Sequence, residues 1–262
     1  PWGLSKMHNK TAVAFFENNL KFTQWLSLSY SAPKRVFEIV DFKEDLVILK
    51  GVDIRLFADA KVDDLVKCDY QNKDEEFVRN IIVRDNMDRS EYFYLPAKIL
   101  HIDGDRDYLN RCLEFYKKAN VFAVGEYVNE NDIGNITLKL LKKYKPDILI
   151  VTGHDSINKS KDVNNINNYK NSKNFVNAVY KAREYEKSHE KLVIIAGACQ
   201  SDYEALIKAG ANFASSPKRI NIHALDPAII AINLALTEKD KDINLIDLLS
   251  KTKYGKDGIG GL

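Results

Sequence analysis

The stretch that decides the fold is Asp147-Ile-Leu-Ile-Val-Thr-Gly-His-Asp155, and Leu192-Val-Ile-Ile-Ala-Gly-Ala-Cys-Gln200 repeats its design. Both are apolar, β-branched runs, which are typical of buried parallel strands. The carboxyl ends of parallel strands meet at one edge of a sheet, where ligands bind. We therefore expect His154 and Cys199 to share that edge. An imidazole beside a thiol is the arrangement that a cysteine nucleophile and its base require.

The wider pattern predicts an α/β domain over residues 92–262, with a largely parallel sheet, right-handed crossovers and flanking helices. Besides the two runs above, we expect strands at 97–102, 120–124, 212–215 and 220–223, and helices at 105–118, 131–144, 175–182, 202–209 and from 226 onward. Upstream, short strands at 35–40, 46–49 and 52–57 predict a small β-barrel-like module over residues 23–68. Residues 69–91 are interpreted as a charged linker, and residues 1–22 stay unassigned.

Composition narrows the class of protein. The net charge of +2 gives no argument for a nucleic-acid partner. Three cysteines, Cys68, Cys112 and Cys199, are too few for a disulfide framework and favour a reducing compartment. The sequence has no CxxC or HExxH zinc motif and no apolar run near 18 residues, so we expect no metal, no cofactor and no membrane span. The abrupt ends lead us to expect a C-terminally incomplete domain.

The surroundings of Cys199 favour a nucleophile. Ser201-Asp-Tyr-Glu204 fits a capping box, so a helix is expected to begin directly after the thiol, and its N-terminus would stabilise a thiolate. The small residues Ala196, Gly197 and Ala198 allow a tight turn, as in a nucleophile elbow with Cys in place of Ser. A lone cysteine in such a run is more often a core residue, but the position of Cys199 at the end of a strand favours a catalytic role.

Other polar residues are predicted at the same sheet edge. Asp155 is a candidate site-support residue or an ordinary turn residue. The candidates for a pocket that would receive a basic substrate side chain are Asp103, Asp105, Asp202, Ser215 and Ser216, although Asp103 and Asp105 also suit a helix cap. His101 and His223 could join His154 and Cys199 in a metal site, but the spacing is not diagnostic. Lys218-Arg219 is a solvated pair and a self-cleavage candidate.

The order and spacing of the pair resemble a known layout. His154 precedes Cys199 by 45 residues (199 − 154), as in caspase-like proteases, and Gly197-Ala-Cys-Gln-Ser201 resembles the element around the caspase cysteine. Longer motifs resemble the YabG family of sporulation-specific cysteine proteases from about residue 28 to the end. They are Leu100-His-Ile-Asp-Gly-Asp105, Lys145-Pro-Asp-Ile-Leu-Ile-Val-Thr-Gly-His-Asp155, Ala196-Gly-Ala-Cys-Gln-Ser201, Ala209-Gly-Ala-Asn-Phe-Ala-Ser-Ser-Pro217 and Asn221-Ile-His-Ala-Leu-Asp-Pro227.

This resemblance implies a caspase-like or flavodoxin-like sheet and a Cys199–His154 dyad that cleaves spore coat and cortex-related proteins after basic residues. It also implies self-cleavage and a place in the cytoplasm of the mother cell or developing spore, or on the spore. In the caspase clan, the amide of a glycine after the histidine joins the oxyanion hole. Here Gly153 precedes His154 and Asp155 follows, so the Cys199 amide is the expected first donor and the second stays open. Gly153, Asp155, Gly197 and Ala198 are the expected site support.

Two other functions stay open. A glutamine-amidotransferase-like amidase places its histidine downstream of the cysteine, and His223, 24 residues (223 − 199) after Cys199, could take that role. A non-enzymatic spore-assembly scaffold, made of a flavodoxin-like module and a barrel, predicts a Cys199 thiol of ordinary reactivity. The oligomeric state is not predicted by the sequence.

Overall fold

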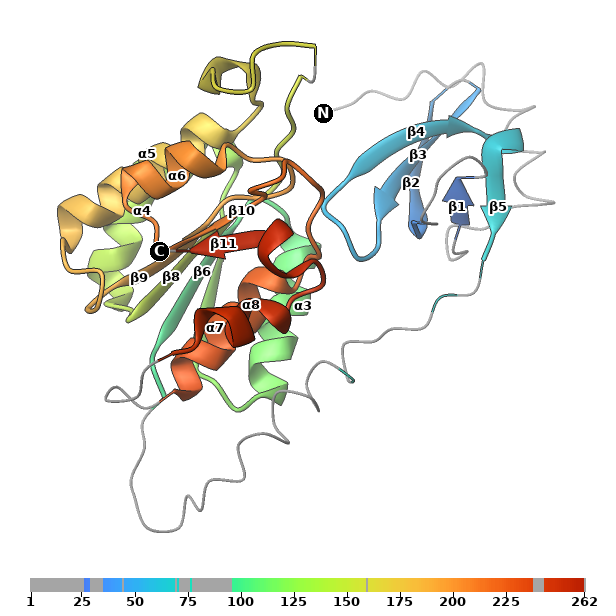
Figure 1. The fold of residues 1–262 in the computed structure, drawn as a ribbon. Helices are drawn as coiled ribbons and strands as arrows, with labels where there is room; N and C mark the ends of the chain where they lie inside the picture. The colour runs from blue at the N-terminus through green and yellow to red at the C-terminus, as the bar shows by residue number, and fades with distance from the viewer. Residues whose placement is uncertain are drawn as a thin grey trace. The chain divides into compact units, whose positions relative to one another are not determined.

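A computed structural model describes residues 26–28, 35–43, 45–68, 70, 76, 96–158, 160–237 and 243–261 (Figure 1). The chain divides into two compact units between Asn72 and Lys73, and each is described by itself. The predicted segment 1–22 and most of the predicted linker 69–91 lie outside the described residues.

The first unit contains a five-stranded antiparallel sheet in the order β4-β3-β2-β1-β5. Its elements are β1 (Leu26–Leu28), β2 (Phe37–Lys43), β3 (Leu46–Gly51), β4 (Phe57–Lys61), the 3-10 turn η1 (Val62–Asp64) and β5 (Leu65–Lys67). Phe37, Val47 and Leu49 are among its buried residues. The expected strand at 52–57 is wrong. The chain turns there, and the Gly51 amide closes the turn by donating to the Leu56 carbonyl at 2.7 Å. Closure of this sheet into a barrel stays a prediction.

The second unit is built around a six-stranded sheet in the order β11-β10-β9-β8-β6-β7. The strands are β6 (Ile99–Asp103), β7 (Ala123–Tyr127), β8 (Ile148–Thr152), β9 (Val193–Ala196), β10 (Phe213–Ser215) and β11 (Ile259–Gly261). The first five are parallel, and β11 runs antiparallel to β10. The parallel strands follow the doubly wound, flavodoxin-like order, whose direction reverses between β6 and β8, and ligands bind beyond the strands at such a point. The predicted α/β class is confirmed. The caspase-like part of the prediction stays a prediction.

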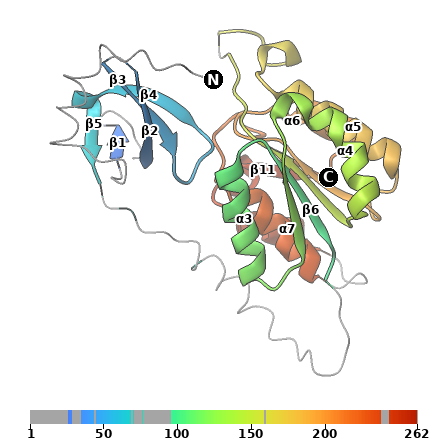
Figure 2. The same ribbon diagram turned by 180° about the vertical axis from the view of Figure 1, so that it is seen from behind.

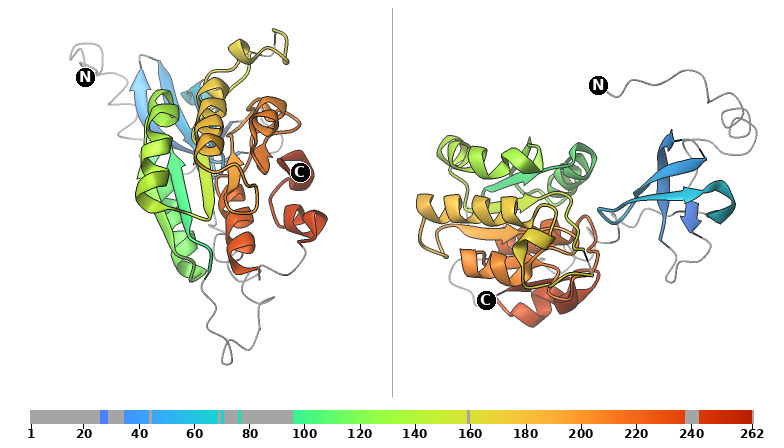
Figure 3. Two further views of the ribbon diagram at one scale, coloured as in Figure 1. Left: turned by 90° about the vertical axis from the view of Figure 1, so that its left-hand side faces the viewer. Right: turned by 90° about the horizontal axis from the view of Figure 1, so that it is seen from above.

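Helices cover both faces of this sheet (Figures 1 and 2). They are α3 (Arg106–Lys118), α4 (Glu130–Tyr144), α5 (Ser172–Tyr185), α6 (Tyr203–Ala209), α7 (Asp226–Leu236) and α8 (Leu245–Ser250), with short 3-10 turns η2 (Ile166–Asn168) and η3 (Gly255–Asp257). Successive strand residues point to opposite layers: Ile148 and Ile150 pack with α3, α7 and α8, whereas Leu149 and Val151 pack with α4, α5 and α6. The two layers are also visible from the side (Figure 3). Burial on both faces explains the unbroken apolar runs in the sequence.

Some element bounds differ from expectation, and one expected strand does not form. β7 begins at Ala123 rather than at residue 120, and α4 is capped by Asn129 rather than Asn131, because the Asn129 side chain accepts from the Asn131 amide. The expected strand at 220–223 is wrong. This segment connects β10 to α7, and β11 takes the place beside β10. No helix in the described part of the chain is long and apolar enough to cross a membrane.

Candidate active site

The ends of β8 and β9 bring His154 and Cys199 to the same edge of the sheet. Val151 pairs with Ala196, and each of the two candidate residues lies three positions beyond that pair. The Gly197 amide continues the pairing by donating to the Val151 carbonyl at 3.0 Å. The strand order reverses between β6 and β8, so His154, after β8, adjoins this switch point, and Cys199 follows the neighbouring strand β9 at the same carboxyl edge of the sheet.

His154 lies between two carboxylates. Its Nδ1 is 3.4 Å from Glu130 Oε1, and its backbone N–H donates to the same oxygen at 3.0 Å. Its Nε2 is 3.6 Å from Asp105 Oδ2, and the side chain is 17% exposed. Burial alone would raise the pKa of Glu130, but the hydrogen bonds and charge of His154 outweigh it and lower that pKa.

Glu130 is the residue that the sequence interpretation missed. It is the first residue of α4, within the polar run Asn129-Glu-Asn-Asp132, and nothing local distinguishes it from a solvated helix start. The available signal was indirect. Gly104 and Gly153 each follow a buried strand, and glycine at such positions is typical of a close approach by other atoms.

The acidic residues at the carboxyl end of β6, Asp103 and Asp105, are buried. Asp105 caps α3 as predicted, because its Oδ1 accepts from the Asp107 and Tyr108 amides at 2.9 and 3.1 Å. Asp103 is fully buried, accepts from the Asp105 amide at 2.8 Å, and lies 3.5 Å from His101 Nε2. Of these two pocket candidates, Asp105 is therefore the one that faces His154. Their role toward a substrate stays a prediction.

Cys199 sits in a tight turn after β9. Gly197 has φ +100° and Gln200 has φ +58°, so a residue with positive φ lies on each side of the cysteine. An alanine Cβ at position 197 would lie 2.7 Å from Leu206 Cδ1, so both the backbone and the packing require glycine there. The thiol is 1% exposed, and its Sγ lies 3.7 Å from the Ile222 carbonyl oxygen.

The predicted capping box after Cys199 is wrong. The cap of α6 is Asp202, whose Oδ1 accepts from the Ala205 amide at 3.2 Å. Ser201 is used elsewhere: its Oγ accepts from the Ala198 amide and donates to Asp155, both at 2.9 Å. Because α6 begins at Tyr203 and is short, it gives no basis for the thiolate stabilisation expected from a helix directly after the thiol.

Asp155 connects the loop after β8, which carries His154, with the turn after β9, which carries Cys199. Its Oδ1 accepts from the Ser156 and Asn171 amides at 2.9 and 2.7 Å, and its Oδ2 accepts from the hydroxyls of Ser172 and Ser201. The residue is 5% exposed, and burial raises its pKa although the hydrogen bonds act in the opposite direction. The carboxylate of Asp155 therefore connects the segment that carries His154 with the turn that carries Cys199, and its role as site support stays a prediction.

The remaining candidates surround the cysteine turn. Ser216 Oγ accepts from the Gln200 amide at 2.9 Å and lies 2.7 Å from the Ile220 carbonyl oxygen. Ser215 is fully buried in β10. Asp202 lies 3.5 Å from the Arg219 guanidinium, which also contacts Glu204 and Tyr169. Asp202 is therefore paired separately from Asp105, which faces His154, and from Asp103, which faces His101.

His223 is 2% exposed and directly follows Ile222, the residue whose carbonyl lies beside the thiol. Its ring Nδ1 accepts from the Leu225 amide at 3.2 Å. Among the residues with described positions, no group of three or more His, Cys, Asp or Glu side chains could hold a metal ion.

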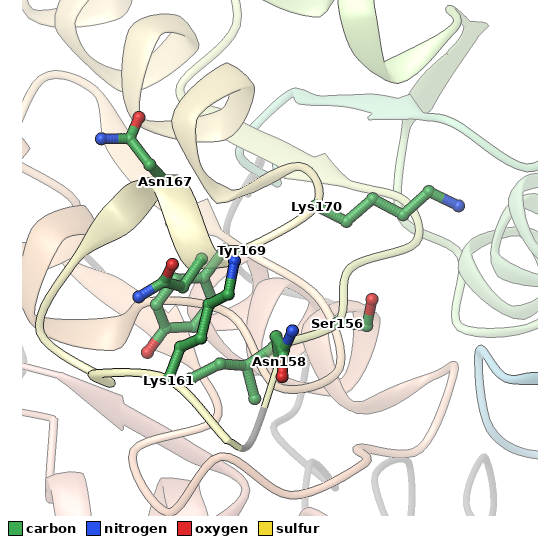
Figure 4. A pocket seen from close by; sticks show the side chains of 8 residues that line it. Ser156, Asn158, Lys161, Asn167, Tyr169 and Lys170 are labelled. Carbon is green, nitrogen blue, oxygen red and sulfur yellow. The ribbon is translucent and has the colours of Figure 1, made fainter.

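A hollow of about 430 Å³ opens in the loop after His154 (Figure 4). Its lining is mainly amide and amine side chains: Ser156, Ile157, Asn158, Lys161, Asn167, Asn168, Tyr169 and Lys170. One wall reaches the cysteine turn, because the Ile157 amide donates to Gln200 Oε1 at 3.4 Å. The polar loop thus borders the residue that follows Cys199.

The amino-acid sequence of the chain is similar to a known family of peptidases. Residues 28–262 match the family described as YabG peptidase U57. Over 245 residues the chain is 39% identical to the sporulation-specific protease YabG of Bacillus subtilis (strain 168), and the match covers 83% of each chain. No solved structure matches the chain.

Proposed function

The chain belongs to the YabG peptidase U57 family, and from this premise we propose that it is a sporulation-specific endopeptidase of the cysteine type. Cys199 is the nucleophile and His154 is its acid–base partner. One observation carries the assignment: the β8–β9 register puts both residues three positions beyond the Val151–Ala196 pair, at the ligand-binding edge of the sheet.

The reaction proceeds through an acyl-enzyme. Cys199 Sγ attacks the carbonyl carbon of the scissile peptide after its proton has passed to His154. His154 then returns that proton to the leaving amine, and a thioester to Cys199 remains. A water molecule, deprotonated by His154, attacks the thioester and releases the carboxylate product and the free thiol. The Cys199 backbone amide is the proposed oxyanion donor.

The buried thiol imposes a conformational requirement on this reaction. Because Cys199 is 1% exposed, the residues that cover its thiol must move before a substrate reaches Sγ, and the segment at residues 220–222 contributes the Ile222 carbonyl to that cover. The same segment follows Lys218-Arg219, the proposed site of self-cleavage, where Lys218 is exposed. Spore coat and cortex-related proteins are the proposed substrates. A basic residue before the scissile bond would be attracted by Asp105, whose carboxylate faces His154.

Single substitutions test the dyad. Cys199→Ala and His154→Ala are each expected to abolish cleavage of a spore-coat protein preparation, with an unchanged far-UV circular dichroism spectrum. Cys68→Ala removes a thiol in the first unit and serves as the matched control with wild-type activity. Full activity in Cys199→Ala would refute the cysteine mechanism.

A second function has one observation in its favour: His223 adjoins the residue whose carbonyl lies beside the thiol. A glutamine-amidotransferase-like amidase would use Cys199 with His223. Glutamine hydrolysis that is lost in His223→Ala and kept in His154→Ala would select the amidase over the protease. The scaffold alternative predicts that iodoacetamide alkylates Cys199 no faster than a free thiol at neutral pH.

A further inference from the structure

We infer that Glu130 is a positioning residue for His154 and that Gly104 and Gly153 form the slot that holds its side chain against the ring. The inference rests on the proposed function, because it concerns how the acid–base partner of Cys199 is oriented. It adds a third side chain to the dyad, and it assigns a role to two glycines at adjacent strand ends.

The Glu130 side chain occupies the space that a Cβ atom would need at either glycine. An alanine Cβ at position 104 would lie 2.8 Å from Glu130 Cγ and still closer to the Glu130 carboxylate. An alanine Cβ at position 153 would lie 3.0 Å from both Cγ and Oε1 of Glu130. Neither glycine has a positive φ, so room for Glu130, rather than backbone conformation, is what a side chain there would disturb.

The slot aims one carboxylate oxygen at two hydrogen-bond donors of the same residue. Glu130 Oε1 accepts the His154 backbone N–H at 3.0 Å and faces the ring Nδ1 at 3.4 Å. The backbone hydrogen bond fixes the loop, and the ring contact fixes the orientation of the imidazole. Contacts of this length in a substrate-free site are expected to tighten when substrate binds.

The contact also selects the nitrogen that transfers the proton. When Nδ1–H points to Glu130, Nε2 is left for exchange with the thiol. Nε2 lies 3.6 Å from Asp105 Oδ2, on the other side of the ring from Glu130. A carboxylate therefore lies beside each ring nitrogen of His154. The lowered pKa of Glu130 keeps it ionised for this role.

A double-mutant cycle tests both parts of the inference. Glu130→Ala is expected to lower kcat about 100-fold with little change in KM, because a displaced catalytic group costs rate rather than binding. Gly104→Ala is expected to produce a similar loss by pushing Glu130 away from His154. The double variant is expected to be no slower than Glu130→Ala, because position 104 then has room for a methyl group.

Two further variants separate orientation from general effects. Asp132→Asn removes a charge from the same first turn of α4 without touching His154, and is expected to keep wild-type kcat. Glu130→Gln keeps an acceptor for the backbone N–H and is expected to recover part of the rate. The ¹⁵N signal of the His154 ring is expected to shift in Glu130→Ala and in Gly104→Ala, and to stay in place in Asp132→Asn.

The outcomes distinguish this inference from the dyad itself. Wild-type kcat and an unshifted His154 signal in Glu130→Ala would overturn the role of Glu130 while inactive Cys199→Ala still supported the dyad. Additive losses in the double variant would overturn the slot. If Cys199→Ala stayed active, the proposed function would fail, and the ring signal would still report whether Glu130 holds His154.

Discussion

Replacing Asp155 with alanine tests whether one buried carboxylate joins the loop that carries His154 to the turn that carries Cys199. The substitution removes the acceptor of four donors, namely the Ser156 and Asn171 amides and the Ser172 and Ser201 hydroxyls. A buried donor left without a partner costs about 1–3 kcal/mol. The hydroxyls can rotate toward other acceptors, whereas the two amides cannot, so the gross cost is about 2–6 kcal/mol.

Relief of the buried charge offsets part of this cost, since burial raises the pKa of Asp155 and so disfavours its ionised form. We expect the free energy of unfolding to fall by about 2–4 kcal/mol. With a urea dependence of about 2 kcal/mol per molar, the urea midpoint falls by about 1–2 M. Asp155→Asn keeps an acceptor for both amides, so its midpoint should fall by less.

The assay is urea unfolding of the full chain, followed by circular dichroism at 222 nm. The α-helices with described bounds all belong to the second unit, so this signal reports the fold around Asp155. Cleavage measured at low urea should fall in the same order, alanine below asparagine below wild type. If the urea midpoint of Asp155→Ala falls by less than about 0.3 M, or if that of Asp155→Asn falls further than that of Asp155→Ala, the carboxylate does not stabilise the fold as an acceptor.

Two further predictions concern the cysteine turn and the buried Asp226. Gly197→Ala should lose about 1–3 kcal/mol of stability and most cleavage activity, because φ is +100° and Leu206 blocks the new methyl group. Gly255→Asn, at φ +53° with the nearest atom 3.9 Å from the added Cβ, is the control whose urea midpoint should barely move. Burial raises the pKa of Asp226 despite attraction by His223 and two backbone hydrogen bonds. Its contribution to stability is therefore complete below about pH 3.8 and is lost as the pH rises through the raised pKa. The urea midpoint of wild type relative to Asp226→Asn should accordingly fall between pH 4 and neutral pH, and a constant difference would contradict this assignment.

The sheet could be predicted from sequence because local chemistry and tertiary packing agree in its strands. The runs Ile148–Val151 and Val193–Ala196 are apolar at every position, and successive residues of each run pack into opposite layers of the domain. Asp105 was predictable for the same reason: a carboxylate directly before a helical pattern caps that helix in the structure. In these elements, residues that are adjacent in the sequence determine the secondary structure and the helix cap.

The sequence did not predict the elements and contacts that depend on residues far away along the chain. Ser201 and Glu204 fit a capping box, but Asp155 and Ala198 engage Ser201, and Asp202 takes the cap. β11 was missed because Ile259–Gly261 is mostly glycine, and only its pairing with β10 makes it a strand. Glu130 contacts a histidine 24 residues away through a gap left by two glycines, and no local pattern could reveal that geometry.

Covalent labelling of the cysteines is the most direct test of whether Cys199 is the nucleophile. A peptidyl chloromethyl ketone ending in arginine is incubated with the full chain, and mass spectrometry locates the adduct among Cys68, Cys112 and Cys199. We expect a single adduct on Cys199, loss of cleavage in proportion to labelling, and much slower labelling in His154→Ala. An adduct confined to Cys68 or Cys112, or undiminished cleavage by fully Cys199-labelled protein, would contradict this expectation.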